Sequence, residues 1–147
     1  MMLRFFIPIR PLNLKNQRGH WSVRYRYSES MRAATATLGK EAMRLAQVAI
    51  DPTVPKAISL TAYLPRRFDQ QDGLPASLAP VVDGLQVPRD VPILRGRHAG
   101  DVRHLVGCGI IHHDGVGSGH LVSYRQEVRK PWGVLVQVEW EEKEEVQ

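Results

Sequence analysis

Residues 56–85 decide the fold and read KAISLTAYLPRRFDQQDGLPASLAPVVDGL. The first part, Lys56–Leu64, alternates between apolar and polar residues and contains β-branched side chains, which predicts a strand. Pro65–Gln71 is a short polar turn. Asp72–Leu85 then predicts a helix, with Asp72 as its N-cap. A strand followed directly by a helix favours an architecture in which helices cover a sheet.

The residues before this unit predict one strand and one long helix. Leu3–Ile9 is short, apolar and β-prone, whereas residues 11–27 lack periodicity and predict a loop. Ser28 is a suitable helix N-cap, and the Asp51-Pro52 pair is a stop signal. The apolar positions after Ser28 recur at helical spacing and form one stripe: Met31, Ala34, Thr35, Leu38, Ala42, Leu45, Ala46 and Ala49.

The second half of the chain predicts three further strands. Residues 86–107 are rich in Pro, Gly and Arg without a clear period, and they predict a long surface loop or insertion. Val106–His113 is a short apolar run that predicts a strand. Leu121–Val128 and Gly133–Trp140 alternate well and are joined by residues 129–132, which resembles a hairpin connection.

These elements predict a single α+β domain over residues 1–140, with a mixed β-sheet, two main helices on it and the order β-α-β-α-β-β-β. Residues 141–147 form a charged tail. The chain has 147 residues and 43% hydrophobic residues, enough for one core. No stretch is apolar enough to span a membrane. Cys108 is the only cysteine, which excludes an internal disulfide and fits a cytoplasmic location.

Charge is divided unevenly along the chain. Residues 1–67 contain 12 Lys/Arg and 3 Asp/Glu, a net charge of +9, whereas residues 68–147 contain 8 and 12, a net charge of −4. A basic half can neutralise phosphates, and an acidic half can hold a cation. A nuclease needs both properties, although an ordinary solvated surface with uneven charge would look the same.

Four aspartates are candidates for chemistry, namely Asp69, Asp72, Asp83 and Asp114. Asp72 and Asp83 share one face of the predicted helix, but they lie about 16 Å apart along its axis, so Asp72 is the better primary metal ligand. Asp69 lies at the mouth of the same helix, and Asp114 ends the apolar run before Gly115. Carboxylates at the ends of elements are the hard oxygen ligands that Mg²⁺ prefers. The alternative is that each one only caps a helix or forms a turn.

The order of these motifs resembles the signature of RusA-like Holliday junction resolvases. Residues 66–85 are similar to its basic pair, Asp-x-Asp-Asn-Leu box, helix and Asp-Gly-Leu. Residues 109–114, Gly-Ile-Ile-His-His-Asp, resemble a second box that usually ends in paired aspartates. The opening residues 6–13, the nearby His20-Trp21 pair and the closing residues 126–134 also resemble the family.

The resemblance implies a homodimeric, Mg²⁺-dependent endonuclease, with Mn²⁺ able to substitute and no small-molecule cofactor. Such enzymes cut four-way DNA junctions by paired nicks during recombination and repair, and they are often encoded by phages or prophages. Asp72 then corresponds to the second aspartate of the first box, and Asp114 to the last aspartate of the second. Asp83 or Asp69 would assist them.

The sequence departs from that signature at five positions: Gln70 replaces the first box aspartate, Gly73 replaces its asparagine, Ala76 and Ala79 occupy the expected places of a helix lysine, and His113 replaces a companion aspartate. Asp69 is displaced by one position from the first aspartate. Asp90 lies nearer the usual spacing after Asp-Gly-Leu than Asp114 does. The alternative function is therefore a protein of the same fold that binds DNA junctions without cutting them.

Basic and aromatic residues interleave before the long helix, as in surfaces that grip phosphates and stack on exposed bases. The predicted DNA-binding residues are Lys15, Arg18, His20, Trp21, Arg24, Arg26, Arg66 and Arg67. The alternative is that Trp21, Tyr25 and Tyr27 are core anchors. Four histidines, at positions 104, 112, 113 and 120, show no ligand spacing and are interpreted as incidental loop residues. A different nuclease that uses them would not need Asp72.

Overall fold

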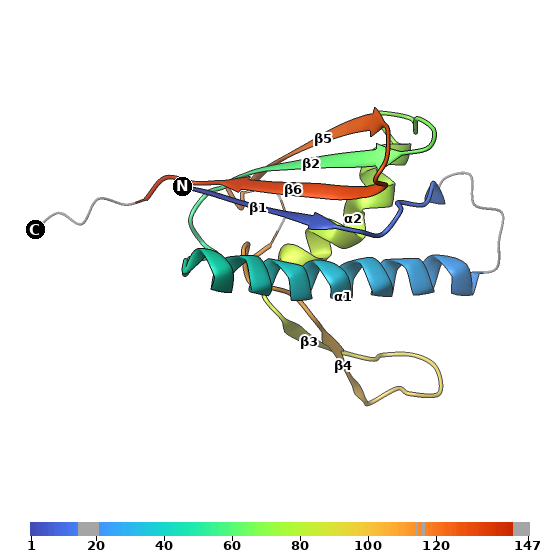
Figure 1. Ribbon diagram of the computed structural model, residues 1–147. Helices are drawn as coiled ribbons and strands as arrows, with labels where there is room; N and C mark the ends of the chain where they lie inside the picture. Colours follow the sequence, from blue (N-terminus) through green and yellow to red (C-terminus); the bar gives the residue numbers. More distant parts are fainter. Residues whose placement is uncertain (15–20, 114, 116, 143–147) are drawn as a thin grey trace, which may run out of the picture.

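The computed structural model describes residues 1–14, 21–113, 115 and 117–142. A mixed four-stranded sheet carries both helices on one of its sides, and a separate two-stranded hairpin extends away from them (Figure 1). The elements are β1 (Met2–Ile7), α1 (Trp21–Ala46), β2 (Ala57–Leu64), α2 (Gly73–Leu85), β3 (Arg89–Pro92), β4 (Val102–Leu105), β5 (Leu121–Val128) and β6 (Gly133–Glu139). The predicted α+β domain is confirmed.

The strand order in the main sheet is β1-β6-β2-β5. β6 is antiparallel to both β1 and β2, whereas β2 and β5 are parallel and pair from Ala57↔Leu121 to Leu64↔Val128. The predicted hairpin between β5 and β6 is therefore wrong, because β2 lies between them. β6 and β2 are the two central strands of the sheet. Their inward residues are almost completely buried, as for Leu60 and Val136 at 0% exposure.

Helix α1 begins at Trp21, well before the predicted cap at Ser28, and ends at Ala46. The loop predicted for residues 21–27 is therefore wrong. Those residues mix charged and aromatic side chains on a largely exposed turn, so they show no apolar stripe. The stripe itself is partly confirmed, since Met31 and Thr35 are fully buried, while Leu45 is 68% exposed. Neither helix among the described residues combines the length and apolarity needed to cross a bilayer.

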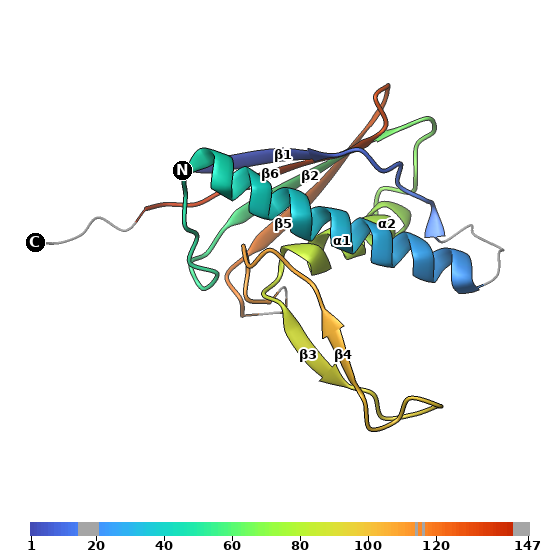
Figure 2. The ribbon, with the colours of Figure 1, turned by 60° about the horizontal axis from the view of Figure 1, so that its bottom comes forward.

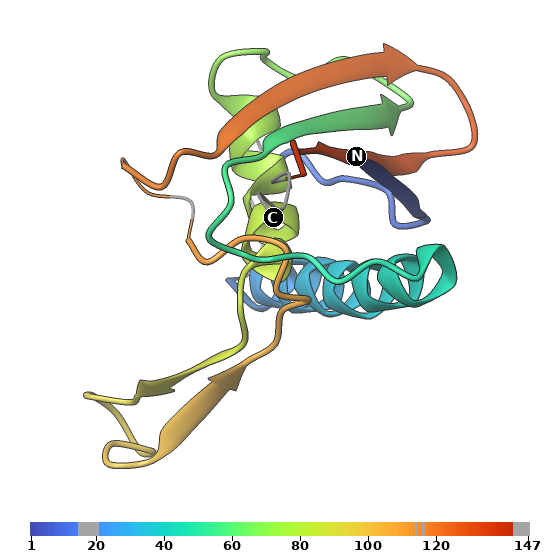
Figure 3. The same cartoon turned by 90° about the vertical axis from the view of Figure 1, so that its left-hand side faces the viewer.

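Residues 86–107 form an ordered β-hairpin and not the predicted irregular loop. β3 and β4 pair antiparallel from Arg89↔Leu105 to Pro92↔Val102. We call residues 89–105 the arm. Figures 2 and 3 show that it leaves the body below α1 and points away from the sheet. Its alternating polar residues carry no strong strand signal, which is why composition alone suggested a loop.

The strand predicted at Val106–His113 is also absent. This segment instead crosses the end of α2, where Ile110 and Ile111 are fully buried. One isolated bridge, Gln86↔Ile111, and the hydrogen bond from the Val87 N–H to the Ile111 carbonyl (2.9 Å) hold it there. The apolar residues of this segment are therefore explained by burial against α2 and not by pairing in a sheet.

Candidate functional site

The mouth of α2 is organised by Asp69. One oxygen of its carboxylate accepts hydrogen bonds from the backbone N–H groups of Gln71 (2.9 Å) and Asp72 (3.1 Å). Its carbonyl accepts from the Leu74 N–H (2.8 Å). Asp72 occupies the N-cap position, but with helical dihedral angles and no side-chain capping hydrogen bond. Asp72 therefore takes the predicted N-cap position, but its side chain does not cap the helix, and the Leu74 N–H bonds to the Asp69 carbonyl instead.

The loop before α2 is tied to the edge strand β5. The Gln126 side chain accepts from the Phe68 N–H (2.8 Å) and donates to the Phe68 carbonyl (3.0 Å) and to Gln70 Oε1 (2.9 Å). Gln70 Nε2 in turn donates to the Tyr124 carbonyl (2.9 Å). Gln70, which replaces the first aspartate of the family box, therefore contributes to holding the loop against the sheet.

Asn13 supplies an oxygen atom beside this loop. Its Oδ1 is inaccessible to solvent and has no hydrogen-bond partner among the described residues. The segment that carries it is fixed against α2, because Ser77 donates to the Leu12 carbonyl (2.6 Å) and the buried Tyr27 hydroxyl donates to the Ser77 carbonyl (2.7 Å). An orphaned, buried acceptor is costly, so this atom calls for a ligand.

Asp69 and Asn13 both lie next to Gly73, the first residue of α2. A Cβ at this position would lie 3.4 Å from Asp69 Cβ and 3.7 Å from Asn13 Oδ1. Asp69 and Asn13 thus lie beside the first residue of α2, and Asp72 directly precedes it. Carboxylate and amide oxygens are donor types that suit Mg²⁺. Sequence reasoning did not single out Asn13, although it lies in the opening segment that resembles the resolvases.

The remaining predicted carboxylates lie elsewhere or outside the described part of the chain. Asp114 lies outside the described residues. Asp83 is half-buried and lines a cavity of about 400 Å³ together with Arg24, Arg32 and Arg103, which makes it a counter-charge to arginines. Among the described residues, no group of three or more His, Cys, Asp or Glu side chains is placed to hold a metal ion. Asn13 would add an amide oxygen to the two carboxylates at the start of α2.

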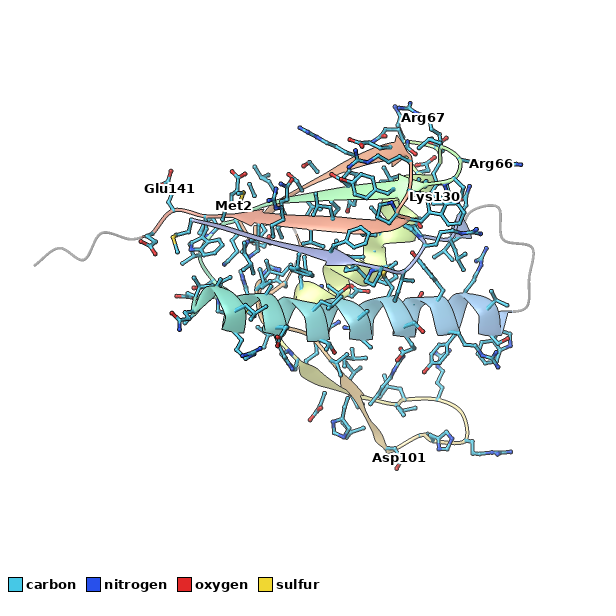
Figure 4. The ribbon with its side chains drawn as sticks, in the orientation of Figure 1. Met2, Arg66, Arg67, Asp101, Lys130 and Glu141 are labelled. Atoms are coloured by element: carbon cyan, nitrogen blue, oxygen red, sulfur yellow. The ribbon has the colours of Figure 1, made fainter. Side chains whose placement is uncertain are left out.

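Basic residues surround the same end of the molecule. Arg10, Asn13, Arg66 and Phe68 line a cavity of about 420 Å³. Figure 4 shows Arg66, Arg67 and Lys130 at this end, and Met2 and Glu141 at the opposite end. We call the first of these the basic end. Its positive charge comes from segments that are distant in sequence, and such a surface attracts a polyanion.

An aromatic ring anchors two of the cations at the basic end. The Arg10 guanidinium lies 5.6 Å and the Lys130 amine 5.2 Å from the centre of the Trp132 ring. Such cation–π contacts hold long side chains in place. The result is a positively charged surface whose side chains are partly ordered before any ligand binds.

The predicted DNA-binding residues fall into three groups. Lys15, Arg18 and His20 lie outside the described residues. Trp21 is 69% and Tyr25 49% exposed, whereas Tyr27 is buried, so only the last of these aromatics is a core anchor. The exposed Arg24 and Arg26 lie on the same first turns of α1, and Arg24 donates to the Leu14 carbonyl (2.7 Å). Arg66 and Arg67 are exposed at the basic end.

Three of the histidines gather, which their spacing did not indicate. His112 Nδ1 lies 3.1 Å from His120 Nε2 and 2.8 Å from the Pro52 carbonyl, and the rings of His112 and His113 are 4.2 Å apart. Burial lowers the pKa of His120, and the nearby Lys56 charge lowers it further. His104 instead pairs with Asp90 on the arm (2.5 Å).

Comparison with known proteins found no relative: no family model matches the chain, and no curated protein or solved structure is significantly similar to it.

Proposed function

We propose that this protein is a Mg²⁺-dependent endonuclease that cuts branched DNA, with four-way junctions as its substrates and paired nicks as its products. The observation that carries the proposal is the buried Asn13 Oδ1, which has no hydrogen-bond partner among the described residues and lies near Gly73 and Asp69 at the start of α2. A cluster of hard oxygen donors next to arginines suits a cation that acts on a phosphodiester.

Asp72, Asp69 and Asn13 would hold the metal ion, and the family resemblance adds Asp114. Mg²⁺, or Mn²⁺ in its place, supplies stabilisation of negative charge on the phosphate and activation of a water molecule. Gln126 and Gln70 do not contact the metal ion in this proposal. Their hydrogen bonds hold the 68–70 loop in position before the metal or the substrate binds. Because the loop is already ordered, the free-energy cost of ordering it when the substrate binds is smaller.

The basic end positions the DNA. Arg10, Arg66, Arg67 and Lys130 neutralise phosphates, while the exposed rings of Trp21 and Tyr25 offer stacking surfaces for bases near a branch point. The proposed assembly is a homodimer, since a two-fold axis would present two equivalent sites to a symmetric junction. Paired nicks follow from that symmetry.

A second candidate is a junction-binding protein without nuclease activity. It is favoured by Gln70, whose side chain is engaged with β5 where the family signature has an aspartate. It is also favoured by Ala76 and Ala79, which line the cavity beside Asp83 and offer no amine to stabilise a leaving group. This candidate keeps the basic end and the affinity for DNA.

One experiment separates the two candidates. A synthetic four-way junction and a linear duplex of the same arms are incubated with the protein, with and without Mg²⁺ or Mn²⁺. Nicks that need the metal and disappear in Asp72→Asn and Asp69→Asn support the nuclease. Asp114→Asn tests the residue that the resemblance adds, and Asp90→Asn tests its rival by spacing. Glu41→Gln, which changes an exposed carboxylate near the end of α1, is the matched control that should retain cleavage. Junction binding without any nick supports the second candidate, and no preference for DNA refutes both.

A further inference from the structure

The arm is an ordered extension with no role in the proposed metal site. Beyond β3 and β4 its ladder continues through the hydrogen bonds from Ile93 N–H to the Asp101 carbonyl and from Gly100 N–H to the Ile93 carbonyl, both 2.9 Å. Gly96 and Gly100 have φ values of +86° and +94°, which turn the chain sharply. Residues 94–100 form the tip, at the far extremity from the sheet (Figures 2 and 3).

The root of the arm is fixed to α1. Arg103 on β4 forms an ion pair with Glu29 and lies 5.5 Å from the centre of the Tyr25 ring. Arg32 donates from Nε to the Val106 carbonyl (3.1 Å). A Cβ at Gly107 would lie only 1.9 Å from the Gln86 carbonyl oxygen. The segment that enters the arm and the segment that leaves it are therefore in direct contact. These contacts give an otherwise marginal two-stranded hairpin a defined direction.

The tip combines positive charge with an exposed apolar side chain. Leu94 is 82% exposed, and its neighbours Arg95 and Arg97 are exposed too. The arm contains four arginines and two aspartates, and its aspartates lie beside histidines: Asp90 beside His104, and Asp101 beside His98 at 3.7 Å. One exposed leucine is ordinary, but an exposed leucine followed by two exposed arginines at the end of an extended arm has the composition of DNA-inserting wedges.

The arm is poorly suited to pair with a strand of a second copy of the chain. Its strands have only four residues each, and β3 carries Pro92, which has no N–H to offer a neighbouring strand. Short strands and proline are features that discourage pairing at a sheet edge. A DNA groove, in contrast, admits a two-stranded ribbon and offers phosphates on both sides.

The arm also points in the direction that DNA binding requires. In both Figure 1 and Figure 2 the tip lies toward the end of the molecule where α1 begins and where the 65–71 turn lies, away from the N- and C-termini. The tip and the basic end can therefore contact one extended polyanion. The cavity of about 400 Å³ at the root of the arm is lined by three arginines, Arg24, Arg32 and Arg103, and by the carboxylates of Glu29 and Asp83, so its lining keeps one net positive charge.

We propose that the tip of the arm grips branched DNA, with Arg95 and Arg97 on phosphates and Leu94 against unstacked bases at the branch point. The proposal rests on the DNA-binding part of the proposed function and is independent of catalysis. It assigns a role to residues 86–107, a segment longer than the corresponding connection in the resembled family.

Charge removal tests the phosphate contacts. Arg95→Gln/Arg97→Gln is compared with Arg4→Gln/Arg44→Gln, which removes two exposed arginines from β1 and from the last turn of α1. Junction binding is measured in EDTA, so that no cleavage occurs, over a series of salt concentrations. The slope of log K against log[salt] should be about 1.8 less steep for the tip variant, which corresponds to about 60-fold weaker binding at 0.1 M salt. The control variant should leave this slope unchanged.

The wedge is tested with Leu94→Ser and its matched control Leu121→Ser, an exposed leucine on β5 (74%). A junction with 2-aminopurine at the branch reports base unstacking by fluorescence. Leu94→Ser should lose the fluorescence rise and at least tenfold of the preference for junction over duplex, while it keeps its affinity for duplex. Leu121→Ser should behave as the wild-type protein does.

The outcomes separate this proposal from the nuclease. Junction binding that depends on the tip, without metal-dependent nicks, supports the arm and refutes the nuclease. Junction binding and cleavage that are indifferent to all tip variants overturn the arm and leave the nuclease intact. The arm proposal is also overturned when the tip variants change the oligomeric state in sedimentation velocity, because the tip would then join protein copies.

Discussion

Asn13→Leu tests the metal site and the fold together. Asn13 Oδ1 is buried without a partner among the described residues, and such an acceptor costs about 1–3 kcal/mol relative to an apolar group of similar shape. Without metal, we therefore expect the variant to be more stable than the wild-type protein by about that amount. For a chain of this size, each kcal/mol corresponds to a rise of about 2–4 °C in Tm.

Mg²⁺ should reverse that order. A ligand present at about 100 times its Kd stabilises the folded state by about 2.7 kcal/mol, and only the protein that keeps the Asn13 oxygen gains it. We therefore expect the Tm of the wild-type protein to rise by about 5–11 °C on addition of Mg²⁺, and that of Asn13→Leu to rise little. Thermal unfolding followed by circular dichroism, with and without Mg²⁺, measures both effects.

Two further variants make the result decisive. Asn13→Asp keeps an oxygen donor and should keep the Mg²⁺-induced rise, while it is less stable without metal because a buried carboxylate is charged. Glu41→Gln, near the end of α1, should keep the whole rise. An Asn13→Leu protein that is destabilised in the absence of metal and still shows the full response to Mg²⁺ would contradict the placement of Asn13 in the metal site.

Three other predictions follow from the contacts. Gly84→Ala should destabilise the protein by about 1–3 kcal/mol, because its Cβ would lie 2.7 Å from the Arg32 carbonyl oxygen; urea unfolding measures the loss. Gln126→Leu removes the hydrogen bonds that hold the 68–70 loop and should lower the rate of junction cleavage more than junction affinity, which single-turnover kinetics and binding assays compare. Because the folded pKa of His120 is lowered below 6.5, the unfolded chain binds more protons as pH falls through that window. Stability should then be lost below about pH 6.5, and His120→Phe should flatten this part of the pH profile in urea unfolding.

Local patterns predicted the elements that have one dominant signal. β2 and α2 follow from the alternation and apolar periodicity of residues 56–85, because burial of one face requires those patterns. Strand partners did not follow, since the alternation of β5 fits either neighbour. Only the packing of the whole sheet places β2 between β5 and β6. The start of α1 was missed because its first turns, including Trp21 and Tyr25, are exposed and carry no apolar stripe.

The sequence indicated only the part of the candidate site that lies at a recognisable helix start. Asp69 and Asp72 could be found from sequence, because they flank a helix start, where carboxylates are common for structural and for chemical reasons alike. The structure divides these roles, since the Asp69 carboxylate accepts two backbone N–H groups and the Asp72 side chain caps none. Asn13 could not be assigned, because its approach to Gly73 depends on how the segment before α1 crosses α2.

Charge shows most clearly what the fold adds to the sequence. Along the chain, positive charge belongs to residues 1–67 and negative charge to the remainder. In space Lys130, from the acidic half of the sequence, lies with Arg66 and Arg67 at one end of the molecule, while Glu141 and Met2 lie at the opposite end (Figure 4). The tip of the arm, also from the acidic half, adds the exposed Arg95 and Arg97. A molecule polarised in this way orients itself as it approaches a polyanion, so the oxygen donors at α2 would face the phosphates before specific contacts form.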